Sequence, residues 1–198
     1  MDKKPTKGEY LEVLLRSPKT IFSTKDVALL WSENDNLVVT DRLKRYVRAG
    51  KLIRLRRGFY AKDTNYDHFE LATRIYTPSY ISFETVLTRA GINFQKYDSI
   101  FVASYVTRDI EADGQKISYI RMKNYVLSNT AGIEHQNGVA VATKERAFLD
   151  RIYVSKDYHF DYLDPLNWDE IFEILPTYNN KRMTKKVNEY LEYYKSNK

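Results

Sequence analysis

The sequence contains no cysteine, and only seven glycines and five prolines among 198 residues. The absence of cysteine excludes disulfide bonds, thiolate metal sites and cysteine nucleophiles, and it agrees with a reducing cytoplasm. No apolar run approaches the length of about 20 residues that a transmembrane helix needs. The N-terminal residues also lack the apolar core of a signal peptide. We therefore expect a cytoplasmic protein that does not associate with membranes.

Catalytic signals are equally scarce. The sequence has neither a glycine-rich phosphate loop nor a nucleophile elbow. The three histidines are far apart and lack the spacing of metal ligands: His68, His135 and His159. A nuclease-like site would require three carboxylates near predicted strand ends to come together: Asp98, Glu111 and Asp113. Because loop acids are common, we expect a protein that is not an enzyme and that holds neither a cofactor nor a metal ion.

Positive charge is present but unevenly distributed. Residues 1–62 contain 15 Lys and Arg against 7 Asp and Glu, a balance of +8, whereas the other 136 residues contain 17 against 19, a balance of −2; together these give the net +6. Between Arg42 and Lys62 there are nine basic residues and no acidic one. Such segregation indicates a surface for a polyanion, most simply nucleic acid, although a solvated basic face gives the same pattern.

Three helices are predicted in this basic third. Residues 6–16 form an amphipathic helix that ends at Ser17-Pro18. Ser23 is a suitable N-cap for a second helix that runs through Trp31, with Asp26 at the capping-box position.

The third helix is expected from Leu37 to about Ala49, with Gly50 as its C-terminal stop. Its apolar stripe consists of Val39, Leu43, Tyr46 and Val47. The other faces are polar and mostly basic.

The segment KLIRLRRGFYA, residues 51–61, predicts a hairpin with a turn at Gly58. Alternation along a strand gives it two faces, Ile53, Leu55 and Arg57 on one, Leu52, Arg54 and Arg56 on the other. We expect Ile53 and Leu55 to pin the hairpin to the helical core. Helices followed by a basic hairpin predict a winged helix-turn-helix.

In that motif one helix enters the major groove of DNA, and the hairpin, or wing, contacts the adjacent backbone. Arginine suits both tasks, because its guanidinium binds guanine or phosphate through two donors. The sequence therefore predicts binding of double-stranded DNA, although a winged helix can also bind protein. The predicted DNA-binding residues are Thr40, Arg42, Lys44, Arg45, Arg48, Lys51, Arg54, Arg56 and Arg57.

Residues 63–198 are predicted to form a second, α+β domain, after a polar connection that ends the winged helix at residue 62. Helices are expected over 67–76, 82–90 with Ser82 as N-cap, 143–153, 167–175 and 180–195, and strands over 99–106, 116–122 and 139–142.

Two charged features of this second domain have ordinary explanations. Arg146 and Asp150 have the i,i+4 spacing of an ion pair, which we expect to lie on the surface. The last helix carries a basic side that either is solvated or attracts an acidic partner: Lys181, Arg182, Lys185 and Lys186.

Three segments, in order, resemble the AbiEi family of antitoxins and transcriptional regulators from type IV toxin–antitoxin, or abortive infection, systems. They are GKLIRLRRGFYA, PSYISFETVLTRAGI and VAVATKERAFLD, and the similarity covers most of residues 8–155. Lys144 stands where the family usually has proline, and Thr85-Val86-Leu87 replaces a more typical Ser-Ala-Leu.

The resemblance implies a repressor that binds inverted repeats in the promoter of its own operon through the winged helix. It also implies that the second domain counteracts a nucleotidyltransferase-like toxin encoded alongside, a role in phage defence. The alternative is a winged-helix regulator whose second domain senses a ligand or partner, with no toxin involved.

Overall fold

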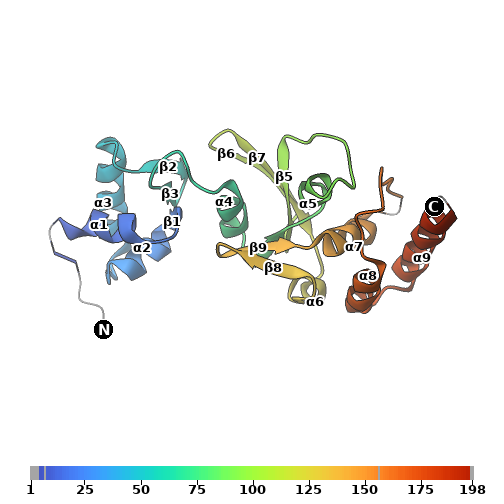
Figure 1. Cartoon of the computed structure of the whole chain (residues 1–198). Helices are drawn as coiled ribbons and strands as arrows, with labels where there is room; N and C mark the ends of the chain where they lie inside the picture. The colour runs from blue at the N-terminus through green and yellow to red at the C-terminus, as the bar shows by residue number, and fades with distance from the viewer. Residues whose placement is uncertain (1–4, 7, 156, 197–198) are drawn as a thin grey trace. The chain divides into compact units, whose positions relative to one another are not determined.

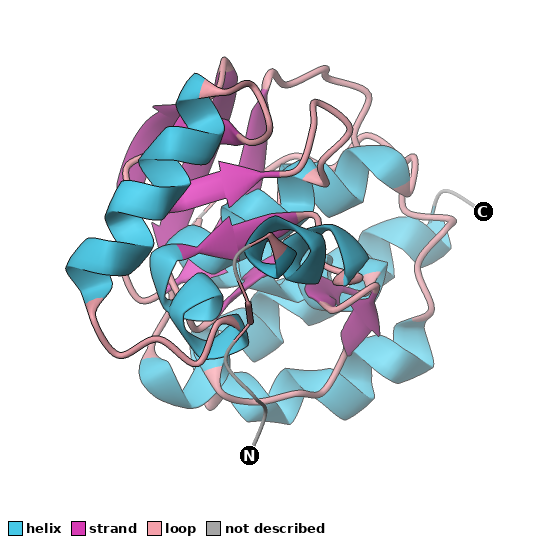
Figure 2. Ribbon diagram, turned by 90° about the vertical axis from the view of Figure 1, so that its left-hand side faces the viewer, coloured by secondary structure: helices cyan, strands magenta, loops and turns pink. Residues whose placement is uncertain are grey.

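The computed structural model describes residues 5–6, 8–155 and 157–196 as a mixed α+β protein (Figures 1 and 2). The α+β class is therefore confirmed. The chain divides into two compact units between Leu71 and Ala72. Residues 1–4 and 7 of the predicted first domain, and 156 and 197–198 of the second, lie outside the described residues.

The N-terminal unit contains three helices and a small sheet, in the order α1, β1, α2, α3, β2, β3 (Figure 1). The helices are α1 (Glu9–Arg16), α2 (Thr24–Leu30) and α3 (Asn36–Arg48). The strands β1 (Ile21–Ser23), β2 (Ile53–Arg56) and β3 (Phe59–Ala61) form an antiparallel sheet in the order β1-β3-β2. The hairpin β2–β3 was predicted, and β1 was not.

Local capping fixes where these helices begin and end. The predicted capping box is confirmed, since the Asp26 amide donates to Ser23 Oγ at 3.1 Å and the Ser23 amide donates to Asp26 Oδ2 at 2.8 Å. Asp35 Oδ1 accepts from the Leu37 amide at 2.8 Å and starts α3. Gly50, at φ 65°, follows the end of α3 in the left-handed region that favours glycine.

The core of this unit is built around Trp31, whose indole Nε1 donates to the Tyr10 carbonyl at 2.8 Å. The Tyr10 and Trp31 rings meet edge to face at 5.2 Å between centroids. The buried members of this cluster are Tyr10, Leu14, Phe22, Val27, Trp31, Val39, Leu43, Leu52 and Tyr60.

The predicted attachment of the hairpin to that core was wrong in part. Leu52 joins the cluster, whereas Ile53 is half-buried and Leu55 is buried outside the cluster. Leu52 directly precedes β2, so strand alternation does not govern it, and a β-bulge between Arg54 and Arg56 interrupts the alternation of faces before Leu55 and Arg56.

The boundary between the units lies later than residue 62 because the following segment is tied back to the N-terminal unit. Glu70 Oε2 accepts from the Thr20 amide at 3.0 Å and from its hydroxyl at 2.5 Å. The Asp67 amide donates to Thr20 Oγ1 at 3.1 Å, and Tyr66 is buried. The division falls inside helix α4 (His68–Ile75).

The C-terminal unit contains a mixed six-stranded sheet in the order β6-β7-β5-β4-β9-β8. Its strands are β4 (Ser79–Ile81), β5 (Ser99–Ser104), β6 (Arg108–Ala112), β7 (Gln115–Arg121), β8 (Ile133–Gln136) and β9 (Val139–Ala142). Strands β5 and β7 are parallel, and a turn at Asp113-Gly114 joins β6 to β7.

Helix α7 (Lys144–Val154) is the centre of the helical layer and packs against α5, α8 and α9. The remaining elements are α5 (Glu84–Arg89), α6 (Asn124–Leu127), α8 (Trp168–Ile174), the 3-10 helix η1 (Leu175–Tyr178) and α9 (Lys181–Ser196). Ser82 was predicted to be the N-cap of α5, but Phe83 occupies that position. The Ser82 hydroxyl instead donates to Asp150 Oδ2. In the described part of the chain, no helix is both long and apolar enough to cross a membrane.

Candidate functional site

The outer face of α3 is strongly basic. Lys44, Arg45 and Arg48 are exposed on it, opposite the buried Val39 and Leu43. Helical spacing places all three predicted contacts on this one face.

Two predicted DNA-binding residues of α3 lie at the edge of that face. Thr40 is half-buried. The half-buried Arg42 guanidinium lies over the Tyr10 ring, 3.4 Å from its centroid, and 5.6 Å from that of Trp31. A cation–π contact of this kind stabilises the fold by about 0.5–2 kcal/mol. Arg42 therefore packs against the core of this unit. The sequence does not indicate this packing, because a charged residue is expected on the polar face of the helix.

The hairpin supplies the second part of the basic surface. Lys51, Arg54 and Arg57 are exposed. Arg56 is half-buried, and its Nη1 is buried with no hydrogen-bond partner among the described residues.

The turn of the hairpin is held in place by the start of α2. The Thr24 amide donates to the Gly58 carbonyl at 3.0 Å, and the Thr24 hydroxyl lies 3.5 Å from the same oxygen. Gly58 has φ 83°, which glycine adopts without strain. Arg57, next to it, is thereby carried on a fixed loop.

Of the nine predicted residues, six are exposed and three are not. The exposed ones, which we call the basic surface, are Lys44, Arg45, Arg48, Lys51, Arg54 and Arg57. No acidic residue occurs between Arg42 and Lys62, the span that contains all six of these residues, so no carboxylate within it offsets their positive charge.

Among the exposed residues of α3 that sequence reasoning missed are Leu37, Val38 and Asp41. Leu37 and Val38 are apolar, and Asp41 is acidic, so none fits a search for basic residues. The signal for Leu37 and Asp41 is positional, because residues 37, 41, 45 and 48 follow one another at helical spacing along the outer face. Asp41 Oδ2 accepts from Arg45 Nη2 at 2.6 Å.

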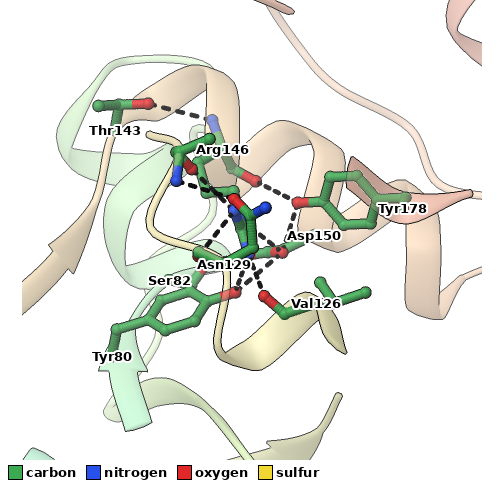
Figure 3. A network of polar contacts seen from close by, with 9 residues as sticks. Tyr80, Ser82, Val126, Asn129, Thr143, Arg146, Asp150 and Tyr178 are labelled. Carbon is green, nitrogen blue, oxygen red and sulfur yellow. Dashed lines mark hydrogen bonds and ion pairs between the residues drawn. The ribbon is translucent and has the colours of Figure 1, made fainter. Parts of the chain in front are cut away.

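The C-terminal unit has a polar centre of a different kind (Figure 3). Arg146 and Asp150, predicted as a surface pair, are completely buried, with Arg146 Nε 3.3 Å from Asp150 Oδ1. Hydroxyl groups of Tyr80, Ser82 and Tyr178 donate to the Asp150 carboxylate at 3.2, 2.7 and 2.6 Å. The prediction was wrong because i,i+4 spacing is the same on a buried helix as on an exposed one.

Backbone carbonyls complete the network around the guanidinium. Arg146 donates to the carbonyls of Ala131 at 2.7 Å and Val126 at 2.8 Å. Burial raises the pKa of Asp150, while Arg146 and the three hydroxyl donors oppose that shift. Such a closed set of partners leaves no group for a substrate, so we assign the network to the stability of this unit.

The other chemical candidates stay dispersed. Strand register brings Asp98, Glu111 and Asp113 to the same end of β5–β7, but in the described ranges no group of three or more His, Asp or Glu is placed to hold a metal ion. On α9, Lys186 pairs with Asp157 and Glu189 at 3.7 and 3.4 Å.

Comparison with known proteins yields no match, either to a protein-family model or to a curated protein. The likeness to the AbiEi family thus stays a prediction.

Proposed function

We propose that this protein is a DNA-binding transcriptional regulator in which residues 1–62 act as a winged helix-turn-helix. The observation that carries the proposal is the basic surface on α3 and the β2–β3 hairpin. Six exposed cations from one helix and one hairpin suit the phosphates of a duplex. In this proposal α3 enters the major groove and the hairpin contacts the neighbouring backbone.

The fixed turn of the hairpin supports this division of tasks. Because Thr24 holds the Gly58 carbonyl, the backbone that carries Arg57 is fixed before DNA binds, which reduces the entropy that the turn loses on binding. Arg54, in β2 and three residues earlier, is also exposed.

The second half of the proposal rests on the resemblance to the AbiEi family. We propose that the protein acts in the cytoplasm, represses its own operon by binding inverted repeats in the promoter, and counteracts a nucleotidyltransferase-like toxin encoded next to it. The counteracting activity is assigned to the C-terminal unit, which neither performs catalysis nor holds a cofactor in this proposal.

Salt dependence tests the DNA-binding half. With about six phosphates neutralised, the slope of log K against log[salt] will be about −5 for the protein's own promoter. Replacing Arg54 and Arg57 with alanine will make the slope shallower by about 2, because each removes one phosphate contact. Binding is measured by fluorescence anisotropy between about 50 and 200 mM salt.

Arg16→Ala is the matched control, since Arg16 is an exposed arginine on α1 outside the basic surface. It will leave the slope unchanged. A slope near zero for the wild type, or equal affinity for the promoter and a random duplex, contradicts the proposal.

Growth rescue tests the antitoxin half. Cells that express the neighbouring gene will stop growing, and this protein, supplied from a separate promoter, will restore growth. The Arg54→Ala/Arg57→Ala variant will rescue equally well, because neutralisation is assigned to the other unit. A harmless neighbour, or toxicity that the protein does not relieve, would leave a regulator whose C-terminal unit senses a ligand or partner.

A further inference from the structure

We propose that Leu37 and Asp41 determine which DNA sequence this protein selects. Leu37 packs against the methyl group of a thymine, and Asp41 holds Arg45 in the orientation that binds a guanine. The inference rests on the proposed function, in which α3 enters the major groove. It concerns two residues that neither charge nor the resemblance singles out.

Leu37 is an apolar residue at the position where a recognition helix contacts the bases. It lies in the first turn of α3, and its side chain is 80 % exposed. A single exposed leucine needs no explanation by itself. Leu37, however, starts the stripe that continues through Asp41 to Arg45 and Arg48, opposite the buried Val39.

The chemistry of the major groove gives such a residue one favourable contact. The N-terminal residues of a recognition helix reach the base edges. Thymine is the base that presents a methyl group there, and apolar side chains bind it. Asp35 caps the Leu37 amide at 2.8 Å, so the backbone of this turn is held in place before binding.

Asp41 has the wrong charge for an ordinary DNA-binding face. It is the one acidic residue in the sequence of α3, and its side chain is 60 % exposed. Non-specific binding is mainly electrostatic, so a carboxylate here weakens binding to every duplex.

The same carboxylate restrains the residue best suited to read guanine. Asp41 Oδ2 accepts from Arg45 Nη2 at 2.6 Å. A guanidinium held in this way loses less entropy when it binds the O6 and N7 atoms of guanine. Asp41 therefore raises selectivity at the expense of general affinity, as a specificity element does.

The first experiment uses the full chain and a pool of random duplexes to select a preferred sequence, then compares the selected duplex with a shuffled one at constant salt. Asp41→Asn removes the charge at nearly constant size. It will bind the shuffled duplex about 3–10-fold more tightly, and the selected-to-shuffled affinity ratio will fall at least about 10-fold.

Glu12→Gln is the matched control, because Glu12 forms a similar exposed i,i+4 pair, with Arg16 at 2.5 Å on α1. It will leave the affinity ratio unchanged. An unchanged ratio in Asp41→Asn overturns the role of Asp41.

The second experiment removes single methyl groups from the DNA. Each thymine of the selected duplex is replaced in turn by deoxyuridine, which lacks only the methyl group. One such replacement will weaken wild-type binding about 4-fold, the value for one buried methyl or methylene group. The same replacement will leave the affinity of Leu37→Ala unchanged, whereas Leu29→Ala, which alters an equally exposed leucine on α2, will respond as the wild type does.

Equal deoxyuridine sensitivity in Leu37→Ala and the wild type overturns the role of Leu37, as does the lack of any sensitive thymine. Failure of the wild type to enrich any duplex overturns the proposed function instead, so the two failures are distinguishable.

Discussion

Replacing Asp150 with alanine will destabilise the C-terminal unit by about 3–5 kcal/mol, because it leaves the Arg146 charge buried without its carboxylate. Arg146 and Asp150 are both 0 % exposed. The hydroxyls of Tyr80, Ser82 and Tyr178 lose their acceptor in the same step. A change of this size is a large fraction of the stability of an ordinary domain, about 5–15 kcal/mol.

Urea denaturation followed by tryptophan fluorescence measures this change. The chain has one tryptophan in each unit, so a Trp31→Phe background reports the C-terminal unit through Trp168. Glu192→Ala, which breaks an exposed pair with Lys195 on α9 of the same unit, will change the stability by less than about 1 kcal/mol. A similarly small effect of Asp150→Ala would contradict the burial of the network.

A double substitution separates the lost charge pair from lost packing. Arg146→Met with Asp150→Leu removes both charges and keeps apolar volume. Because no charge is then buried alone, the double variant will be more stable than Asp150→Ala. It will still be less stable than the wild type, since the Ala131 and Val126 carbonyls lose their donor.

Features that depend on adjacent residues could be predicted from the sequence. Ser23 caps α2, as expected from its position before an apolar periodic segment, and Thr143 caps α7 at the start of the helix predicted over 143–153. Asn167 caps α8 directly ahead of Trp168. Capping needs only a few consecutive residues, so a single sequence contains the necessary information.

The two missed edge strands of the large sheet show where local patterns fail. Strand β6 has the sequence RDIEA and β8 the sequence IEHQ, and each lies at one edge of its sheet. Edge strands tolerate charged and polar residues because one side has no neighbouring strand. The alternation of apolar residues that identifies a strand is therefore weak in both.

The candidate site was predictable as a region more than as a set of residues. Charge located the basic surface, but it also selected Arg42, which packs on Tyr10. Conversely, the expectation that apolar residues lie in the core gives no reason to select Leu37, which is exposed. The burial of Arg146 depends on Tyr80 and Tyr178, far away in the sequence, so no local pattern indicates it.

Alkaline pH will destabilise the C-terminal unit through the same network. Burial, followed by the charge of Asp150, raises the pKa values of Tyr80 and Tyr178 well above 10.0. Both phenols therefore keep their protons in the folded state at a pH where the unfolded chain loses them. Since the folded state then binds more protons, stability is full below pH 10 and falls as the pH rises above it.

Each of these tyrosines contributes a loss of about 1.4 kcal/mol per pH unit above pH 10. Urea denaturation between pH 8 and 11.5 measures the slope, and absorbance at 295 nm will show that both phenols ionise only on unfolding. Tyr178→Phe will reduce the slope by about 1.4 kcal/mol per pH unit, whereas Tyr193→Phe, on the exposed side of α9, will not. Equal slopes in Tyr178→Phe and the wild type would mean that the Tyr178 phenol ionises without unfolding, contrary to its place against the Asp150 carboxylate.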